Sequence, residues 1–356
     1  HSAATLSTSF LSLTTEDATL ASPLSSSPLA REERCSRHTE MRSRRRVTLA
    51  VLGALLLSLL LVLGLIALGR RPMDDDEAEQ RRRQRRLRQA CRAHGGAGAL
   101  EDLPAALLDH VLVDDAHGLL YCAVPKVAST NWRRVLLALR SPAAADPSRI
   151  PANRSHEPSA FRSLAQLSRP EQRRRLSTHL KFVFARHPLE RLLSAYRNKF
   201  ERAWSDYFPR RYGRLIVRQQ RGPNASRHAL DTGRGVRFDE FLAYVASLDA
   251  RDHAAAFNEH WRPLSELCFP CQVRYDVLGL YDTLERDSRL VLGRAGLAGR
   301  VALPSRRRTY SAEPTAALMR RYYENVSEAL MGSLLQGVYR RDMEMFRYER
   351  RYPPFD

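Results

Sequence analysis

The chain has 356 residues, and its 58 Lys and Arg residues outnumber its 39 Asp and Glu residues, which gives a formal net charge of +19. This balance favours polyanionic partners, namely nucleic acid, acidic lipid or acidic polysaccharide. Five cysteines in a chain of this length are too few for a fold built mainly on disulfides.

The first 46 residues are predicted to be a disordered cytosolic tail, because Ser, Thr and Ala dominate its first 40 residues without apolar periodicity. An arginine-rich stretch directly follows Met41, which we expect to be the natural start. Residues 47–69 form an almost unbroken apolar run without a charge. About 20 such residues span a bilayer core as a helix, so this run is predicted to be a single transmembrane signal anchor.

Three N-x-[ST] sequons follow the anchor, at Asn153, Asn224 and Asn325, and these are the predicted glycosylation sites. Arginines on both sides of the anchor leave the positive-inside rule undecided. The shared side of the sequons favours a short cytosolic tail and a luminal body, which is a single-pass type II topology.

Residues 70–105 are charged and then rich in Gly and Ala, which is typical of a luminal stem. The arginines within residues 81–88 are most simply interpreted as a solvated face, with tethering of a polyanion as the alternative. Residues 106–356 are sufficient for one α/β domain with a sizeable core, and we expect them to form the catalytic domain.

Cys268 and Cys271 form a lone C-x-x-C without a second pair at zinc-ribbon spacing, which argues against zinc. In an oxidising lumen, disulfides are the better interpretation. Both cysteines are expected to pair with Cys91 and Cys122 or with each other, and the sequence leaves the connectivity open.

The most informative stretch is a strand-turn-helix at residues 119–139. An apolar, aromatic run predicts a buried strand that ends at Pro125, because proline has no N–H for the ladder. The Ser, Thr and Asn at 129–131 are good N-cap residues, and apolar residues recur at helical spacing after them. A helix N-terminus and the Lys126 amine together suit a phosphate, although the glycines of a Walker A loop are missing. An ordinary turn with a surface lysine has the same spacing.

A second strand-turn-helix follows at residues 180–200, and Pro188 suits the first turn of its helix. Arg186 precedes the N-terminal end of a helix, which already carries a partial positive charge. An anion bound between the two would offset their repulsion. Two such units predict a parallel sheet flanked by helices, whose ligands bind beyond the carboxyl ends of the strands. We therefore expect both turns to converge on one nucleotide.

The other elements are predicted more coarsely. Five prolines within residues 141–170 predict a largely irregular segment, and the basic residues 218–235 predict an exposed loop. Further predicted elements are strands at 111–113 and 273–280 and helices at 236–245, 284–292, 315–330 and 334–346.

Five motifs in order resemble those of the Golgi carbohydrate sulfotransferases, over roughly residues 107–348. VPKVASTNW (124–132) resembles the 5′-phosphosulfate loop of the family, and RHPLERLLSAYRNK (186–199) resembles its 3′-phosphate segment. FNEHW (257–261), LCFPC (267–271) and YDVLG (275–279) most resemble the chondroitin and dermatan members. Ser129 replaces a usual cysteine and is more like the glucuronyl 3-sulfotransferase, and His187 replaces a usual acidic residue.

The resemblance implies a P-loop-like α/β fold with a central parallel sheet, a Golgi membrane location and the donor 3′-phosphoadenosine 5′-phosphosulfate, without a metal. It implies that Lys126 stabilises the leaving group. The residues implied to hold the 5′-phosphosulfate are Pro125, Lys126, Val127, Ala128, Ser129, Thr130 and Asn131. Those implied for the 3′-phosphate segment are Arg186, His187, Pro188, Leu189, Glu190, Arg191, Leu192, Leu193 and Ser194, with Arg186 and Ser194 in direct contact.

The sequence does not identify the general base. Glu259 and His260 are candidates because they lie in a polar break beside an aromatic residue, although a structural role for His260 and Trp261 fits equally well. His187 and Glu190 are further candidates.

The acceptor implied by the resemblance is O4 of N-acetylgalactosamine in the glycosaminoglycans chondroitin or dermatan. Alternatives are O3 of glucuronic acid and a terminal N-acetylgalactosamine on an N-glycan. An alternative of another class is a non-enzymatic, membrane-anchored polyanion binder. The luminal placement and the lack of a stacking-aromatic module argue against nucleic acid, and the oligomeric state is left open.

Overall fold

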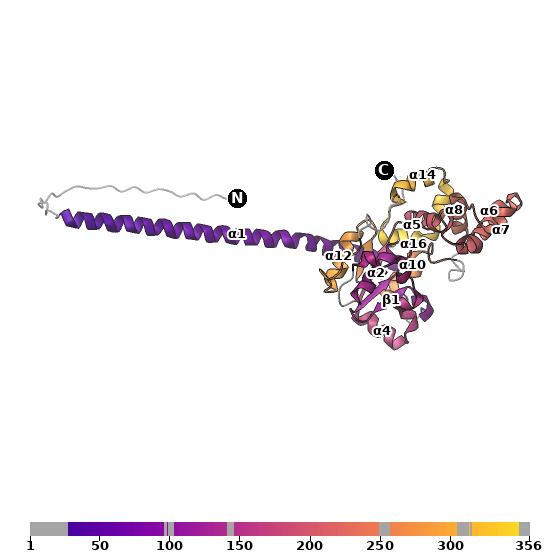
Figure 1. Cartoon of the computed structure of the whole chain (residues 1–356), viewed down its shortest axis with the longest axis horizontal. Helices are drawn as coiled ribbons and strands as arrows, with labels where there is room; N and C mark the ends of the chain where they lie inside the picture. The colour runs from indigo at the N-terminus through magenta and orange to yellow at the C-terminus, as the bar shows by residue number, and fades with distance from the viewer. Residues whose placement is uncertain are drawn as a thin grey trace, which may run out of the picture. The chain divides into compact units, whose positions relative to one another are not determined.

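The computed structural model describes residues 28–95, 98, 103–140, 146–248, 257–304, 313 and 315–348. It divides into two compact units, residues 1–71 and 72–356. The second unit combines a five-stranded sheet with helices, so the predicted α/β class is confirmed (Figure 1).

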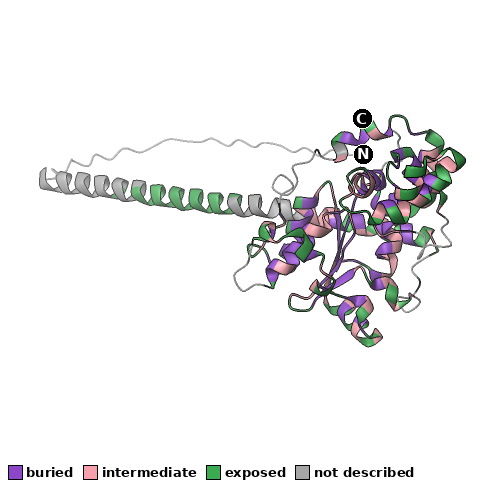
Figure 2. Cartoon of the chain, turned by 45° about the vertical axis from the view of Figure 1, so that its right-hand side comes forward, coloured by how far each residue is buried: buried purple, intermediate pink, exposed green. Residues whose placement is uncertain are grey.

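Helix α1 spans Pro28–Ala93. Within it, Val47–Gly64 has a mean hydropathy of 2.7 and is fully exposed, so the described helices include one segment long and apolar enough to cross a membrane (green in Figure 2). The tail expected to be disordered up to residue 46 is helical from Pro28, because its Arg, Glu and Leu residues are good helix formers. Residues 1–27 of that tail lie outside the described residues.

The sheet has the strand order β3-β1-β2-β4-β5. Its strands are β1 (Val111–Asp114), β2 (Leu119–Cys122), β3 (Arg162–Ser163), β4 (Leu180–Ala185) and β5 (Val277–Leu280). The prediction of a parallel sheet is correct for β2, β4 and β5. It is wrong for β1 and β3, since β1 pairs antiparallel with both β2 and β3. Only a short turn joins β1 to β2, and a short turn permits only antiparallel pairing.

Aromatic side chains of β2, β4 and α2 (Ser129–Leu139) form the core beside the sheet. The ring of Tyr121 stacks on Phe182 at 4.8 Å between centroids. Trp132 lies 4.6 Å from Phe182 and 5.4 Å from Phe184. All four side chains are buried, and Figure 2 shows the strands in purple between helices with green outer faces. This packing fixes the start of α2 against the two central strands.

Helices follow β4 and β5 as predicted, namely α5 (Pro188–Tyr196) and α12 (Leu284–Arg294). Strand β5 is shorter than expected because the short helix α11 (Pro270–Val273) precedes it. Arg274 ends α11 in the left-handed conformation, with φ of 55°.

Two segments predicted to be irregular contain helices. Residues 141–170 contain α3 (Ala152–Ser155) and the start of α4 (Arg169–Thr178), and residues 218–235 contain the second half of α6 (Arg214–Arg221) and all of α7 (Arg227–Thr232). Helix α4 begins with a capping box, in which the Glu171 carboxylate accepts hydrogen bonds from Ser168 N (3.0 Å) and Oγ (2.8 Å). Pro170 therefore occupies a first helical turn, where its missing N–H costs nothing.

A second core cluster joins α5 and α8 (Phe238–Ser247) to the C-terminal helices around the buried Trp261. These helices are α14 (Thr315–Tyr323), α15 (Glu328–Gly332) and α16 (Arg340–Phe346), with the π-helical η10 (Ser333–Val338) between the last two. In Figure 1, α5, α8 and α14 gather on one side of the second unit, and β1 and α4 lie on the other. The helix expected to continue to residue 330 breaks after Tyr323, and Ser327 caps its successor.

The remaining described elements are short helical turns. They are η2 (Ala105–Leu108), η3 (Pro147–Arg149), η4 (Pro158–Ala160), η5 (Leu164–Gln166), η6 (Arg197–Glu201), η7 (Pro209–Gly213), η8 (Gly222–Asn224) and α10 (Leu264–Leu267).

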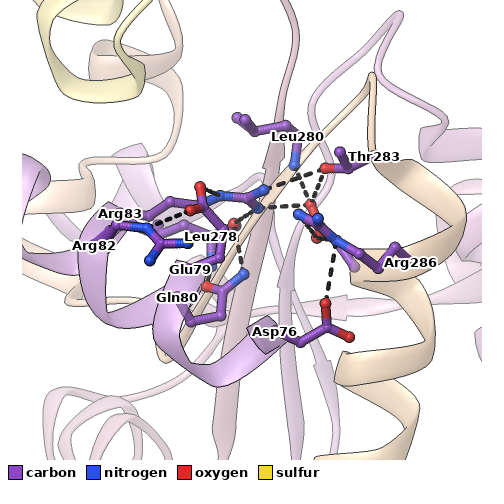
Figure 3. A network of polar contacts seen from close by, with 10 residues as sticks. Asp76, Glu79, Gln80, Arg82, Arg83, Leu278, Leu280, Thr283 and Arg286 are labelled. Atoms are coloured by element: carbon purple, nitrogen blue, oxygen red, sulfur yellow. Dashed lines mark hydrogen bonds and ion pairs between the residues drawn. The ribbon is translucent and has the colours of Figure 1, made fainter. Parts of the chain in front are cut away.

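The last turns of α1 pack onto β5 and α12 (Figure 3). The Gln80 side chain accepts a hydrogen bond from Leu278 N (3.0 Å) and donates one to Leu278 O (3.2 Å). Arg83 is buried, donates to Leu278 O (2.7 Å) and pairs with Asp287 at 2.6 Å. The segment expected to be a solvated stem is therefore part of the folded unit from Asp76 to the end of α1.

The structure selects one of the open disulfide connectivities, Cys91–Cys271 and Cys122–Cys268. The first fastens the end of α1 to α11. The second disulfide joins Cys122, which ends β2 just before the turn at Pro125, to Cys268, which directly follows α10.

Candidate active site

The turn between β2 and α2 has an unusual backbone, with φ of 70° at Lys126 and 57° at Ala128. The expected N-cap is wrong, because Ala128 holds the cap position and Ser129 is the first helical residue. No side chain caps α2, so its first-turn N–H groups are not engaged by a capping side chain. A helix start preceded by left-handed residues forms a concavity of N–H groups that suits an anion.

Lys126 is half-buried in a group of cations. Burial, followed by the charges of Lys199, Arg186 and Arg197, lowers the pKa of the Lys126 amine to about 7. In the described part of the chain, no hydrogen bond or ion pair engages this amine. An anion placed here would relieve the mutual repulsion of the cations, so the residues present fit a phosphate- or sulfate-bearing ligand.

Arg186 links the two predicted turns, since it lies at the end of β4, which pairs in parallel with β2. Its Nη1 donates to Lys126 O at 3.0 Å, and its Nε pairs with Glu190 at 3.0 Å. Its guanidinium lies 4.1 Å from the centre of the Tyr281 ring. The parallel pairing thus brings the two turns together at the carboxyl ends of β2 and β4, as the sequence predicted.

Arg191 is buried, and its guanidinium is occupied by backbone carbonyls. Nε donates to Pro125 O (3.1 Å), and Nη2 donates to Glu259 O (2.6 Å). Nη1 donates to Arg262 O. Arg191 therefore joins the turn at Pro125 to the segment that carries Glu259, and it presents no free guanidinium face to a ligand.

The other predicted residues of the two turns differ in exposure. Ser129, Thr130, His187 and Ser194 are half-buried, and His187 Nδ1 accepts a hydrogen bond from Leu189 N at 3.2 Å. Five side chains are buried in the core, so they can position the backbone of the two turns but cannot contact a ligand. They are those of Val127, Pro188, Leu189, Leu192 and Leu193. Asn131 is buried and donates to Pro304 O at 3.4 Å.

The two base candidates lie close to this group, with different properties. His260 Nδ1 is 2.7 Å from Asn258 Oδ1 and 3.6 Å from the Glu259 carboxylate. Burial and the charges of Lys199 and Lys126 lower the pKa of His260 to about 2, so its imidazole is a poor proton acceptor. Glu259 remains 43% exposed and faces His110 Nε2 at 3.5 Å.

Sequence reasoning missed His110 and His156. His110 directly precedes β1 and its carbonyl accepts from Ala123 N (2.9 Å), which places it beside the end of β2. His156 Nε2 lies 2.9 Å from Thr130 Oγ1 in the first turn of α2. Each is a single histidine in a segment without a recognisable motif. The antiparallel pairing of β1 with β2 brings His110 to the site, and the path of residues 146–156 brings His156 there.

The predicted sequon asparagines, Asn153, Asn224 and Asn325, are all exposed. Within the part of the chain that is described, no group of three His, Cys, Asp or Glu side chains is arranged to hold a metal ion.

Comparison with known proteins gives a consistent picture. Residues 109–349 match the model of a family described as the sulfotransferase family. The chain is 42% identical to carbohydrate sulfotransferase 11 of Rattus norvegicus over 242 residues, which are 68% of this chain and 67% of the relative. It is 35% identical to carbohydrate sulfotransferase 8 of Homo sapiens over 273 residues, which are 76% of this chain and 63% of the relative.

Carbohydrate sulfotransferase 14 of Homo sapiens is 40% identical over 243 residues, which are 66% of this chain and 61% of the relative. No solved structure matches the chain.

Proposed function

Because the chain belongs to the sulfotransferase family and is similar to carbohydrate sulfotransferases, we propose that it transfers a sulfuryl group from 3′-phosphoadenosine 5′-phosphosulfate to a sugar hydroxyl. The observation that carries this donor assignment is the group of cations around Lys126. It lies at the start of α2, which no side chain caps, beside the carboxyl ends of the parallel strands β2 and β4. The family match sets aside a purely non-enzymatic polyanion binder.

The proposed donor site consists of the turn at residues 125–131 and the segment at residues 186–194, in a P-loop-like arrangement. The first-turn N–H groups of α2 and the Lys126 amine hold the 5′-phosphosulfate. Arg186 and Ser194 serve the 3′-phosphate, and the Arg186 bond to Lys126 O keeps the two segments in register. Arg191 positions the first turn through Pro125 O. Lysine and arginine neutralise the donor here without a metal.

The donor supplies an activated sulfuryl group, and its transfer leaves negative charge on the oxygen that bridges sulfur to the 5′-phosphate. The Lys126 amine is placed to stabilise that charge, and its loss typically costs on the order of 10²–10³ in rate. The buried surroundings strengthen this interaction because they exclude water.

The proposed acceptor is O4 of N-acetylgalactosamine in chondroitin or dermatan, supported by the resemblance of residues 257–261, 267–271 and 275–279 to those family members. An anionic polymer also suits a chain with a net charge of +19. O3 of glucuronic acid is the second candidate, because Ser129 favours it. A terminal N-acetylgalactosamine on an N-glycan is the third.

We further propose a Golgi single-pass type II protein, with the anchor at residues 47–69 and the catalytic domain of residues 106–356 in the lumen. The apolar segment Val47–Gly64 and the exposed sequon asparagines support this topology. Enzymatic removal of N-glycans, followed by gel analysis of each Asn→Gln variant, tests it. A chain that carries no glycan at any of the three sites would contradict the luminal placement.

The test of the enzymatic function uses the full chain in detergent with radiolabelled donor. Desulfated chondroitin, desulfated dermatan and a glucuronyl-lactosamine glycan are offered as acceptors, and the products are resolved as disaccharides. Label at O4 of N-acetylgalactosamine supports the first acceptor, and label only on the glucuronyl glycan moves the assignment to O3. Transfer that is unchanged in Lys126→Met would refute the role of Lys126.

A further inference from the structure

We propose that the hydroxyl of Thr130 couples donor binding to proton acceptance by His156, an inference that rests on the proposed sulfuryl transfer. Thr130 Oγ1 and His156 Nε2 are 2.9 Å apart, within hydrogen-bond distance. Thr130 belongs to the first turn of α2, where the donor is proposed to bind, and His156 follows α3. The contact therefore joins the donor site to an imidazole that no motif singled out.

Four described imidazoles lie at or near the site, those of His110, His156, His187 and His260, and of these only His156 is exposed, since His187 is half-buried. The side chains of His110 and His260 are 11% and 14% exposed, whereas His156 is exposed. His260 Nδ1 is bound to Asn258 Oδ1, and His110 Nε2 faces the Glu259 carboxylate. A group that receives the proton of a glycan hydroxyl must touch that hydroxyl, which favours His156.

The charges around His156 keep it neutral in the free protein. Partial burial and the guanidinium of Arg133 lower the pKa of His156 below its ordinary value of 6.5, and Lys199 and Arg134 act in the same direction. The Glu259 carboxylate opposes them. In the tautomer that carries its proton on Nδ1, Nε2 accepts a hydrogen bond from Thr130, so its lone pair is occupied.

A threonine hydroxyl has one proton and donates one hydrogen bond at a time. An anion held by Lys126 and the start of α2 is a stronger acceptor than a neutral imidazole, because a charged acceptor roughly doubles the strength of a hydrogen bond. Donor binding therefore turns the Thr130 hydroxyl away from His156 and frees the Nε2 lone pair beside the sulfuryl group. Without donor, the base stays occupied.

Sulfuryl transfer can then use His156 as the proton acceptor. The acceptor oxygen forms a bond to sulfur and gives its proton to His156 Nε2, which becomes an imidazolium. The bond between sulfur and the bridging oxygen breaks, and its electron pair stays on the 5′-phosphate of the leaving nucleotide beside Lys126. Solvent takes the proton from His156 before the next cycle.

The test follows His156 by NMR in the full chain, solubilised in detergent and labelled with ¹³C at histidine Cε1. The signal is identified by its loss in His156→Gln or His156→Asn. The probe is 3′-phosphoadenosine 5′-phosphate, which carries the phosphates without the sulfuryl group. We expect this nucleotide to raise the pKa of His156, because removing a hydrogen bond to the neutral ring disfavours the neutral form.

Thr130→Val should raise the pKa of His156 in the free protein and reduce the further change that the nucleotide causes. The matched control is Thr178→Val, because Thr178 Oγ1 lies 2.9 Å from His179 Nδ1 in a similar contact outside the site. This control should leave the His156 titration unchanged. His156→Gln should lower kcat by roughly 10²–10⁴-fold without weakening nucleotide binding, because it removes only an acceptor that competes for the Thr130 hydroxyl.

A His156 titration that is the same in Thr130→Val and wild type overturns the coupling, as does a His156→Gln kcat within about threefold of wild type. The proposed function fails separately, if the full chain does not bind the nucleotide or if Lys126→Met leaves transfer unchanged. If the chain binds the nucleotide and its transfer depends on Lys126, but His156→Gln keeps the wild-type kcat, then only the coupling is refuted and the proposed function stands.

Discussion

Raising the pH from 7 to 9 should weaken nucleotide binding by roughly 50-fold through one amine, that of Lys126. In the free protein its pKa is lowered to about 7, so half of the molecules carry the charge at neutral pH. A bound phosphate favours the charged form and returns the pKa toward 10.5, the ordinary value for lysine. Binding therefore takes up a proton between these two pH values, and the affinity falls with rising pH by linkage.

The magnitude follows from the fraction of Lys126 that is charged before binding. That fraction is about one half at pH 7 and about one hundredth at pH 9 for a pKa of about 7. The ratio gives the roughly 50-fold loss, and below pH 6 this amine adds no further dependence. The stability of the free protein changes in the opposite direction: a folded-state pKa below the unfolded one makes the contribution of Lys126 to the free energy of unfolding rise from pH 7 to 10.

Calorimetric titration of the full chain with 3′-phosphoadenosine 5′-phosphate at pH 6 to 9 and constant ionic strength measures this dependence. Lys126→Arg is the matched control, because arginine keeps its charge across this range and should flatten the curve above pH 7. A wild-type affinity that stays constant between pH 7 and 9 would refute the reasoning, since it would mean that burial and the neighbouring cations do not lower the pKa of Lys126.

Arg83→Ala should destabilise the second unit by about 1.5–3 kcal/mol, because the buried Asp287 carboxylate loses its 2.6 Å ion pair and keeps Arg286 at 3.3 Å and the hydrogen bond from Leu280 N. Thermal unfolding measures the loss, and the exposed Arg82→Ala should change little. Cys91→Ser should cost about 2–5 kcal/mol, since its disulfide closes a loop across 180 residues, and an unchanged unfolding midpoint would contradict this. Arg191→Lys should weaken both stability and nucleotide binding, because one ammonium cannot reach the carbonyls of two segments; equilibrium binding with normal affinity would show that Arg191 does not position the turn.

The two strand-turn-helix units were predictable because their apolar periodicity is local and continuous. The left-handed Lys126 and Ala128 were not, because neither residue type signals a positive φ. The helical start of α4 had a signal, the Ser168–Glu171 capping box, which the neighbouring prolines outweighed. Burial of Arg83 could not be predicted from an arginine-rich run, because its partner lies 204 residues away.

The base candidates show the same limit. The polar break beside an aromatic residue predicts Glu259 and His260 as candidates, and Arg191 joins their segment to the turn at Pro125. The low pKa of His260 comes first from its burial and then from the charges of Lys199 and Lys126, which lie on other segments. Local sequence carries no information about such a field, so the structure alone separates His260 from His156.

The pairing of Gln80 with Leu278 has a consequence for solubility. Strand β5 is one of the two outermost strands of the sheet, and an exposed strand edge invites pairing with another chain. Here side chains occupy that edge, since Leu278 N donates to Gln80 and Leu280 N donates to Asp287. A secreted version cut after residue 93 would lose the Gln80 cover and is expected to aggregate through β5. A version that starts at residue 72 keeps this cover, so the last part of α1 also protects the edge of the sheet against self-association.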